Sequence, residues 1–194
     1  YRAGYDEIKI LFDPNKKEYE DAFHYYTTNF EYMRLGEKTQ GKPAIAMLQS
    51  VVDRFLNIAI ISSGKNYCVI KEMGEPTTKE FDNSLRRIFI VMFQMFDKAI
   101  EILKEQETCD INTCKEFHTI DLNVDKFVDY CCRIMNKIET SFPDKKKTLL
   151  FTTLFLLELM GDEFKSIGKH MALGKKNSKE LLPFVELIRE HFDM

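Results

Sequence analysis

Residues Phe155 to Met171 have the sequence FLLELMGDEFKSIGKHM, which predicts one uninterrupted α-helix. No proline interrupts it, and small or apolar residues recur three and four positions apart, at Leu150, Leu154, Leu157, Gly161, Phe164, Gly168 and Met171. At about 100° of rotation per residue, Glu158 lies roughly 40° from Leu154 and Asp162 roughly 80° from it. Two carboxylates therefore stand one turn apart at the edge of the apolar arc. A carboxylate there needs a partner, a proton or a metal ion.

A second pair of acids occupies the same kind of position earlier in the chain. A helix is predicted from about Thr119 to Thr140, and Asp121 and Asp125 lie at the margin of its apolar stripe. The short turn Ser141-Phe-Pro-Asp144 makes this helix and the next, from about Asp144 to Met171, antiparallel neighbours. Each acidic pair lies about four to five turns from that turn, so we expect all four carboxylates at one level.

Four carboxylates at one level suit a hard divalent or trivalent cation. The predicted ligands are Asp121, Asp125, Glu158 and Asp162, and Asn123 and Glu163 could extend the site. The Glu-x-x-His pair of di-iron bundles is absent, because Gly161 stands where the histidine would be, so oxygen activation is not expected. The alternative is that lysine or arginine side chains of a neighbouring helix, such as Arg86 and Arg87, neutralise the acids.

The totals of the chain exclude several classes of protein. Its 194 residues carry a net charge of −3, which argues against a nucleic-acid groove in this segment. No run approaches the roughly 18 apolar residues of a membrane span, so no direct membrane insertion is expected. The five cysteines lack a zinc spacing and no secretory signal is present, which indicates free thiols in the cytoplasm. Because the chain starts at Tyr1 and not at methionine, we expect a further segment upstream.

The residues divide into two predicted domains. Residues 1–75 form a small α+β domain in which we see no catalytic residues; its roles are docking, dimerisation or, less expected, ligand sensing. Its predicted elements are strands at 6–12 and 29–34, helices at 16–26 and 44–56, and a hairpin of 58–62 with 67–71. Residues 77–194 form a mainly α domain, an antiparallel three-helix bundle plus a short C-terminal helix.

Sequence signals mark where the first bundle helix and the short C-terminal helix begin. Thr77 and Glu80 form a capping box before a long apolar stripe, and a polar connection follows from about Glu105 to Thr119. After Gly174, Asn177 or Ser178 caps the short C-terminal helix, with Pro183 in or just after its first turn.

The two acidic motifs resemble those of one known family. Leu157-Glu-Leu-Met-Gly-Asp162 with Ile167 resembles the LERxGDxxxxI signature of PhoU proteins, and Asp121-Leu-Asn-Val-Asp125 resembles the motif on their preceding helix. The arginine of the signature is Leu159 here, and the chain has room for one three-helix repeat where many members have two. Further segments, near Tyr1 to Ile8, Tyr67 to Lys71 and Phe81 to Arg87, resemble archaeal PhoU-domain proteins with an upstream AbrB/SpoVT-like DNA-binding domain.

The resemblance implies a non-enzymatic regulator of phosphate uptake or of the phosphate response. It implies a bound metal ion, Fe, Zn, Mn or Mg, at the four carboxylates, and a homodimer that restores the two-repeat architecture. The expected partners are a phosphate transporter or a sensor kinase, with DNA contacted only through the upstream domain. Two alternatives stay open: a metal-free dimerisation bundle of a transcription regulator, and a metal-dependent hydrolase, for which the four scattered histidines offer no evident general base.

Overall fold

The computed structural model describes residues 1–11, 44–105, 111–138, 141–172 and 178–192. The described chain divides into two compact units, Tyr5–Glu75 and a second unit made of Tyr1–Gly4 with Pro76–Met194. The first four residues thus belong to the helical unit and not to the predicted domain of residues 1–75. The helix and strand expected at 16–26 and 29–34 lie outside the described residues.

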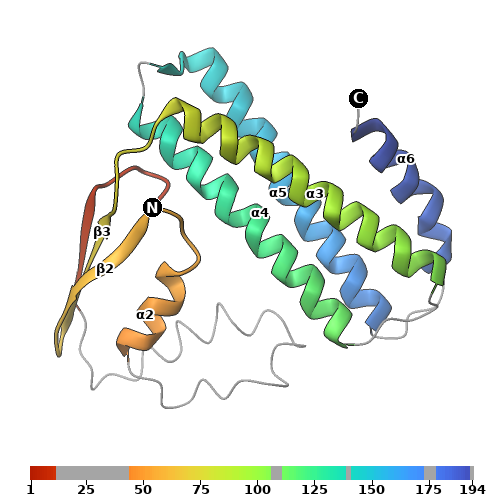
Figure 1. The fold of residues 1–194 in the computed structure, drawn as a ribbon, viewed down its shortest axis with the longest axis horizontal. Helices are drawn as coiled ribbons and strands as arrows, with labels where there is room; N and C mark the ends of the chain where they lie inside the picture. The colour runs from red at the N-terminus through yellow and green to blue at the C-terminus, as the bar shows by residue number, and fades with distance from the viewer. Residues whose placement is uncertain (12–43, 106–110, 139–140, 173–177, 193–194) are drawn as a thin grey trace. The chain divides into compact units, whose positions relative to one another are not determined.

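The helical unit is an antiparallel bundle of three long helices, α3 (Thr78–Glu105), α4 (Ile111–Lys137) and α5 (Asp144–Ala172). The chain then forms a 3₁₀ turn, η3 (Ser178–Leu181), and a short helix, α6 (Leu182–Phe192), which lies along α3 (Figure 1). The predicted fold class is therefore confirmed: a mainly helical three-helix bundle with a short C-terminal helix, after a small α+β segment.

Side chains of all four helices meet in one core. Phe96 of α3 packs edge-on against Phe164 of α5 and Phe192 of α6, with ring centroids 4.9 and 5.0 Å away. The Nε of Arg189 on α6 donates to Asp97 of α3 at 2.9 Å. Fully buried residues line the interior from end to end: Ile88, Met92, Met95, Phe96, Leu103, Val124, Cys131, Ile134 and Leu154. Burial of this apolar surface is what stabilises the bundle.

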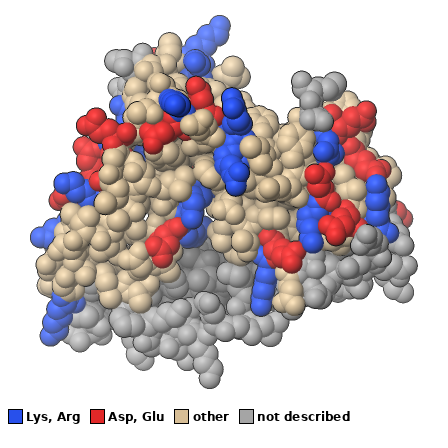
Figure 2. All heavy atoms as spheres, in the orientation of Figure 1, with Lys and Arg blue, Asp and Glu red and all other residues tan. Residues whose placement is uncertain are grey.

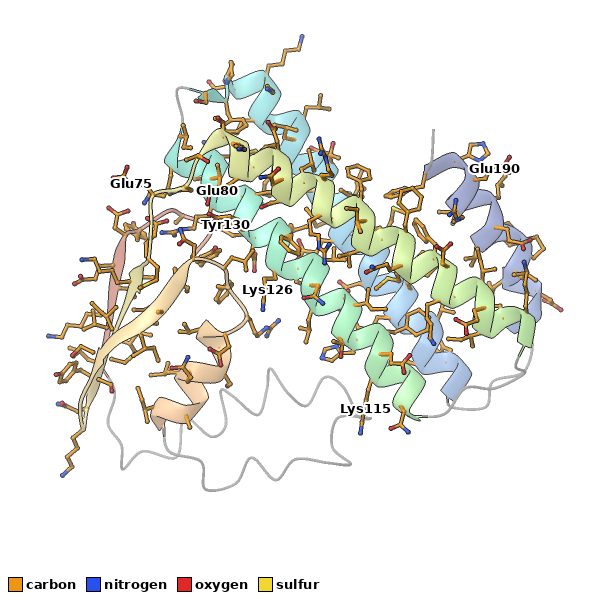
Figure 3. The ribbon with its side chains drawn as sticks, viewed as in Figure 1. Glu75, Glu80, Lys115, Lys126, Tyr130 and Glu190 are labelled. Carbon is orange, nitrogen blue, oxygen red and sulfur yellow. The ribbon has the colours of Figure 1, made fainter. Side chains whose placement is uncertain are left out.

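The start of α3 is fixed by the predicted capping box. The backbone N–H of Thr77 donates to Glu80 Oε2 at 2.7 Å, and the backbone N–H of Glu80 donates to Thr77 Oγ1 at 3.2 Å. The same glutamate accepts a hydrogen bond from the Tyr130 hydroxyl of α4 at 3.3 Å (Figure 3). The cap therefore also connects α3 to α4.

Helix α4 starts at Ile111, about two turns before the predicted start near Thr119. The prediction was wrong because it took the polar residues after Glu105 as a connection and overlooked Phe117. This side chain is 1% exposed and packs against Gly168 of α5. Tertiary packing of one aromatic ring thus extends the helix through a weakly periodic segment.

The Tyr5–Glu75 unit contains a three-stranded antiparallel sheet and one described helix. Strand β3 (Tyr67–Glu72) is central, between β1 (Glu7–Leu11) and β2 (Ile58–Ser63), so the predicted hairpin is confirmed. Helix α2 (Ala44–Val52) packs against β2 and ends before the predicted Leu56. Asn57 has a φ of 61°, a left-handed conformation that asparagine tolerates, and its amide donates to the Gly74 carbonyl at 2.6 Å.

The described helices carry both signs of charge. Lysine and arginine side chains are interspersed with aspartate and glutamate on the face that Figure 2 shows. Within the described part of the chain, no helix has the length and hydrophobicity needed to cross a membrane.

Candidate functional site

Helices α4 and α5 bring Asp121 and Asp162 together on one ammonium group. The Nζ of Lys165 lies 2.6 Å from Asp121 Oδ2 and also binds Asp162 Oδ1. Because Asp121 is on α4 and Asp162 on α5, the shared ammonium confirms that the two acidic motifs stand at one level. The Asp121 side chain is 1% exposed and that of Lys165 is 10% exposed, so this contact is inside the protein.

Gly161 provides the space for the Asp121 carboxylate. A methyl group at Gly161 would lie 3.0 Å from Asp121 Oδ1, tighter than ordinary van der Waals contact. This oxygen is buried, and no described residue donates a hydrogen bond to it. The small residue in the apolar arc of α5 thus has a specific role: it allows a buried carboxylate to lie against the backbone of the neighbouring helix.

Glu158 is neutralised by a residue from the start of the chain. Arg2 Nη2 lies 2.9 Å from Glu158 Oε2 and 3.1 Å from Oε1, and Arg2 Nε binds Asp129 of α4. The first residues are held on α4 by two hydrogen bonds, from Arg133 Nη1 to the Tyr1 carbonyl at 2.9 Å and from Asn136 to the Arg2 carbonyl at 2.8 Å. The guanidinium therefore bridges α4 and α5 through Asp129 and Glu158.

Asp125 is the member of the cluster with the most perturbed carboxyl group. Burial raises its pKa to about 7, and the negative charges of Asp121 and Glu158 act in the same direction. Lys165 lowers the pKa of Asp125 without offsetting these effects. Asp125 therefore exchanges a proton near neutral pH.

The Lys165–Asp121 pair is charged despite its burial. Burial lowers the pKa of Lys165, but the hydrogen bonds from its ammonium to Asp121 and Asp162 outweigh this effect, and the net pKa is raised. Burial also raises the pKa of Asp121, while the hydrogen bond from Lys165 counteracts that rise. We take both groups as ionised, because a separation of 2.6 Å suits an ammonium and a carboxylate.

Three of the four predicted ligands, Asp121, Glu158 and Asp162, thus contact an ammonium or a guanidinium in this conformation. Among the described residues, no group of three His, Cys, Asp or Glu side chains is arranged to hold a metal ion. The neutralising cations are Lys165 and Arg2, and the suggested Arg86 and Arg87 are exposed on α3. The suggested extensions differ too: Asn123 donates to the Thr119 carbonyl of its own helix, and Glu163 is exposed.

One of the two overlooked cations had a signal in the sequence. Lys165 follows Leu154 by 11 positions, which places it at about 20° from that leucine, inside the apolar arc of α5. A lysine in such an arc needs an acidic partner, and Asp162 is three residues away. Arg2 has no comparable signal, because 156 positions separate it from Glu158.

Among the described residues, the cluster contains more negative than positive groups. Its described carboxyl groups are Asp121, Asp125, Asp129, Glu158 and Asp162, and its described cations are Lys165 and Arg2. Even with Asp125 protonated, four of these carboxylates face the two described cations. Such a cluster can accept a further proton or a further cation. Its carboxylate oxygens are the ligands that hard metal ions prefer.

Comparisons with known proteins do not place the chain. No protein-family model matches it, and no curated protein or solved structure is significantly similar to it.

Proposed function

We propose that the protein is a non-enzymatic regulator of the PhoU type, in which a divalent cation and the ammonium of Lys165 compete for the carboxylates between α4 and α5. One observation carries the proposal: Asp125 is half-buried near Asp121 and Glu158, whose charges add to the effect of partial burial and raise its pKa to about 7. This excess of carboxylate is unfavourable, and a divalent cation relieves it more effectively than one lysine does.

The donor set fits a hard cation once Lys165 moves. Asp121 Oδ1 is a buried oxygen to which no described residue donates a hydrogen bond, and Asp125 and Asp162 lie within electrostatic range of it. When bound, a divalent cation would supply the positive charge that Lys165 supplies in its absence. Lys165 has a flexible four-carbon stem, so its ammonium can leave Asp121 and retain the exposed carboxylate of Asp162.

Competition between Lys165 and a divalent cation would give the contact between α4 and α5 two alternative states. In one state Lys165 ties Asp121 of α4 to α5. In the other state Asp121 and Asp125 would hold a divalent cation in place of the Lys165 ammonium, and the proton of Asp125 would pass to the solvent. Any effector that binds only one of these states shifts their populations by its differential affinity.

The family resemblance extends the proposal to cellular partners. On that basis the protein acts as a cytoplasmic homodimer that reports phosphate or metal status to a phosphate transporter or a sensor kinase, and to DNA through an upstream domain. The residues that support this step are the two acidic motifs, Asp121 to Asp125 and Leu157 to Asp162. Fold-level likeness alone does not carry function, so the partner assignment rests on these motifs.

A second candidate function is a metal-free dimerisation bundle. It is favoured by the fact that Lys165 and Arg2 already bridge α4 and α5. In that case the acids serve only to hold the helices in register. Buried polar contacts of this kind select one arrangement even where they add little stability.

Metal binding separates the two candidates. The protein is purified without chelators, analysed by elemental mass spectrometry, and titrated calorimetrically with Mn²⁺, Zn²⁺ and Mg²⁺ after chelation. We expect near-stoichiometric binding, lost in the double variant Asp125→Asn, Asp162→Asn. The matched control replaces two exposed acids outside the cluster, Asp82→Asn and Glu190→Gln, and retains binding. If no cation binds the wild-type protein, the regulatory proposal fails and the dimerisation bundle stands.

A further inference from the structure

Helix α5 is apolar on two opposite sides. Its inner side is buried against α3 and α4 through Leu154, Leu157 and Phe164. Its outer side carries five large apolar side chains that each expose between 45% and 67% of their surface: Leu149, Phe151, Phe155, Leu156 and Leu159. A contiguous apolar side of a helix is expected to be covered, and the described bundle covers only the inner one.

The size of this outer patch matches half of a specific protein interface. An aromatic side chain buries roughly 150–250 Å² when fully covered, so the two half-exposed phenylalanines, together with the three half-exposed leucines, present on the order of 500 Å². Contiguous apolar patches of this size are at the upper end of what monomers expose and mark interaction sites. Two such patches facing each other would cover about 1,000 Å² of apolar surface, the lower bound for a specific interface.

Charges at the two ends of the patch are arranged for pairing with an antiparallel copy. Lys145 lies four positions before Leu149, and Glu163 lies four positions after Leu159; both are exposed. The 18 positions between Lys145 and Glu163 make five full helical turns, so both side chains leave α5 in the same direction, in line with the patch. An antiparallel partner would set Lys145 against Glu163 of the second copy, whereas a parallel partner would set like charges together.

We propose that the outer face of α5 is a self-association surface on which a second copy of this chain packs with its α5 antiparallel. The pairing is centred near Leu154, which sets Leu149 against Leu159 and Thr152 against Leu156 of the other copy. Such an isologous contact has two-fold symmetry and closes at the dimer. The inference deepens the homodimer within the proposed function by assigning its surface, and it does not require a bound cation.

The oligomeric state of the full chain tests the proposal. Sedimentation velocity over a range of concentrations should show a monomer–dimer equilibrium for the wild-type protein. Leu156→Glu should raise the dimer dissociation constant by at least roughly tenfold, because it buries a charge at the centre of the contact. The matched control is Leu187→Glu, which changes an equally exposed leucine on α6 and should leave the equilibrium unchanged. A wild-type chain that is monomeric at its highest soluble concentration, or an equal effect of both variants, overturns the proposal.

A charge exchange tests the antiparallel direction with variants that leave the core intact. Lys145→Glu and Glu163→Lys should each weaken the dimer several-fold, and the double variant should restore it. The expected sign follows because each single variant sets like charges together twice in the symmetric dimer, whereas the double variant re-forms two opposite-charge contacts. Failure of the double variant to restore the dimer overturns the antiparallel arrangement.

The same samples keep this inference separate from the cation proposal. Sedimentation is repeated with a chelator and with Mn²⁺, beside the calorimetric titration. A monomer that binds Mn²⁺ overturns only the self-association surface. A dimer that binds no cation supports the surface and overturns only the cation proposal.

Discussion

Lys165 Nζ lies 2.6 Å from Asp121 Oδ2, and the two side chains are almost entirely withdrawn from water. The pair joins α5 to α4 in the middle of the bundle, at the level of Gly161. Burying two charges costs free energy that their attraction only partly returns, so the pair is weak evidence for stability. Removal of one partner is strongly destabilising, since it leaves the other charge buried without a counter-charge.

The first prediction concerns Lys165→Gln. In the presence of a chelator we expect it to lower the free energy of unfolding by about 3–5 kcal/mol, the cost of an uncompensated buried charge. Under the competition proposed above, Mn²⁺ should restore most of this loss and bind the variant more tightly than the wild-type protein. Urea unfolding with and without Mn²⁺ measures both effects. The control is Lys115→Gln, an exposed lysine of α4 (Figure 3). Loss of stability that no cation repairs would contradict the competition and leave Lys165 as a structural ion pair.

The second prediction concerns pH and Asp125. Its folded-state pKa of about 7 lies above the ordinary value of 3.8, so the folded state holds an extra proton between these two pH values. The free energy of unfolding should therefore fall as the pH rises through this window and should not fall further above it on account of Asp125. Asp125→Asn should flatten this slope, so that the variant is more stable than the wild-type protein at pH 8 but not at pH 4. Unfolding temperatures of the wild-type protein and the variant, measured from pH 4 to pH 8, test this expectation. Parallel profiles for the two proteins would show that Asp125 is not the titrating group.

The third prediction concerns Gly168→Ala. A methyl group there would lie 2.7 Å from Cδ2 of the buried Phe117 ring, too close for any real contact. Alanine gains up to about 1 kcal/mol in helix propensity over glycine, while overpacking a core costs typically 1–3 kcal/mol. We expect a net loss of about 1–2 kcal/mol, seen by urea unfolding. Phe117→Leu in the same background should recover part of the loss by opening space, and no recovery would argue against the Phe117 contact as the cause.

The fourth prediction concerns Arg2→Ala. The side chain binds Asp129 and Glu158, and its removal leaves two part-buried carboxylates without this guanidinium. We expect a loss of about 1–2 kcal/mol, less than for Lys165, because Arg2 is 41% exposed and water screens what remains. Arg2→Lys should recover only part of it, since an ammonium does not reproduce the two-sided geometry of a guanidinium. Full stability in the alanine variant would mean that water replaces Arg2 without cost.

Local patterns predicted the parts of this fold that local interactions stabilise. The capping box at Thr77 and Glu80, the proline-marked start of α5 at Asp144 and the hairpin of β2 and β3 all follow from residues that are near in sequence. The level of Asp121 and Asp162 followed from counting turns on either side of one short connection. The start of α4 could not be predicted from local patterns, because it depends on the packing of Phe117 against Gly168, and these residues are far apart in the chain.

Four acids of the candidate site were named from the sequence, whereas Asp129 and the two cations were missed. Acids at the edge of an apolar arc are easily recognised in a sequence, and four of them at one level predicted a bound metal ion. Lys165 was not among the suggested neutralising side chains, although its position inside the apolar arc is more costly than that of Glu158 at the edge. Arg2 becomes a neighbour of Glu158 only through the tertiary fold, so no pattern within either segment indicates the pair.

The adjacent thiols of Cys131 and Cys132 offer a way to follow the bundle as it opens. Both are buried, and burial raises the pKa of Cys132 to about 11 and that of Cys131 further still. Neither thiol therefore reacts with an alkylating reagent while α3, α4 and α5 remain closed. Cys68, buried in the Tyr5–Glu75 unit, is protected by a different part of the chain. After Cys109→Ser and Cys114→Ser, the labelling rates of these three thiols would report separately on when each unit opens, with no probe added to the molecule.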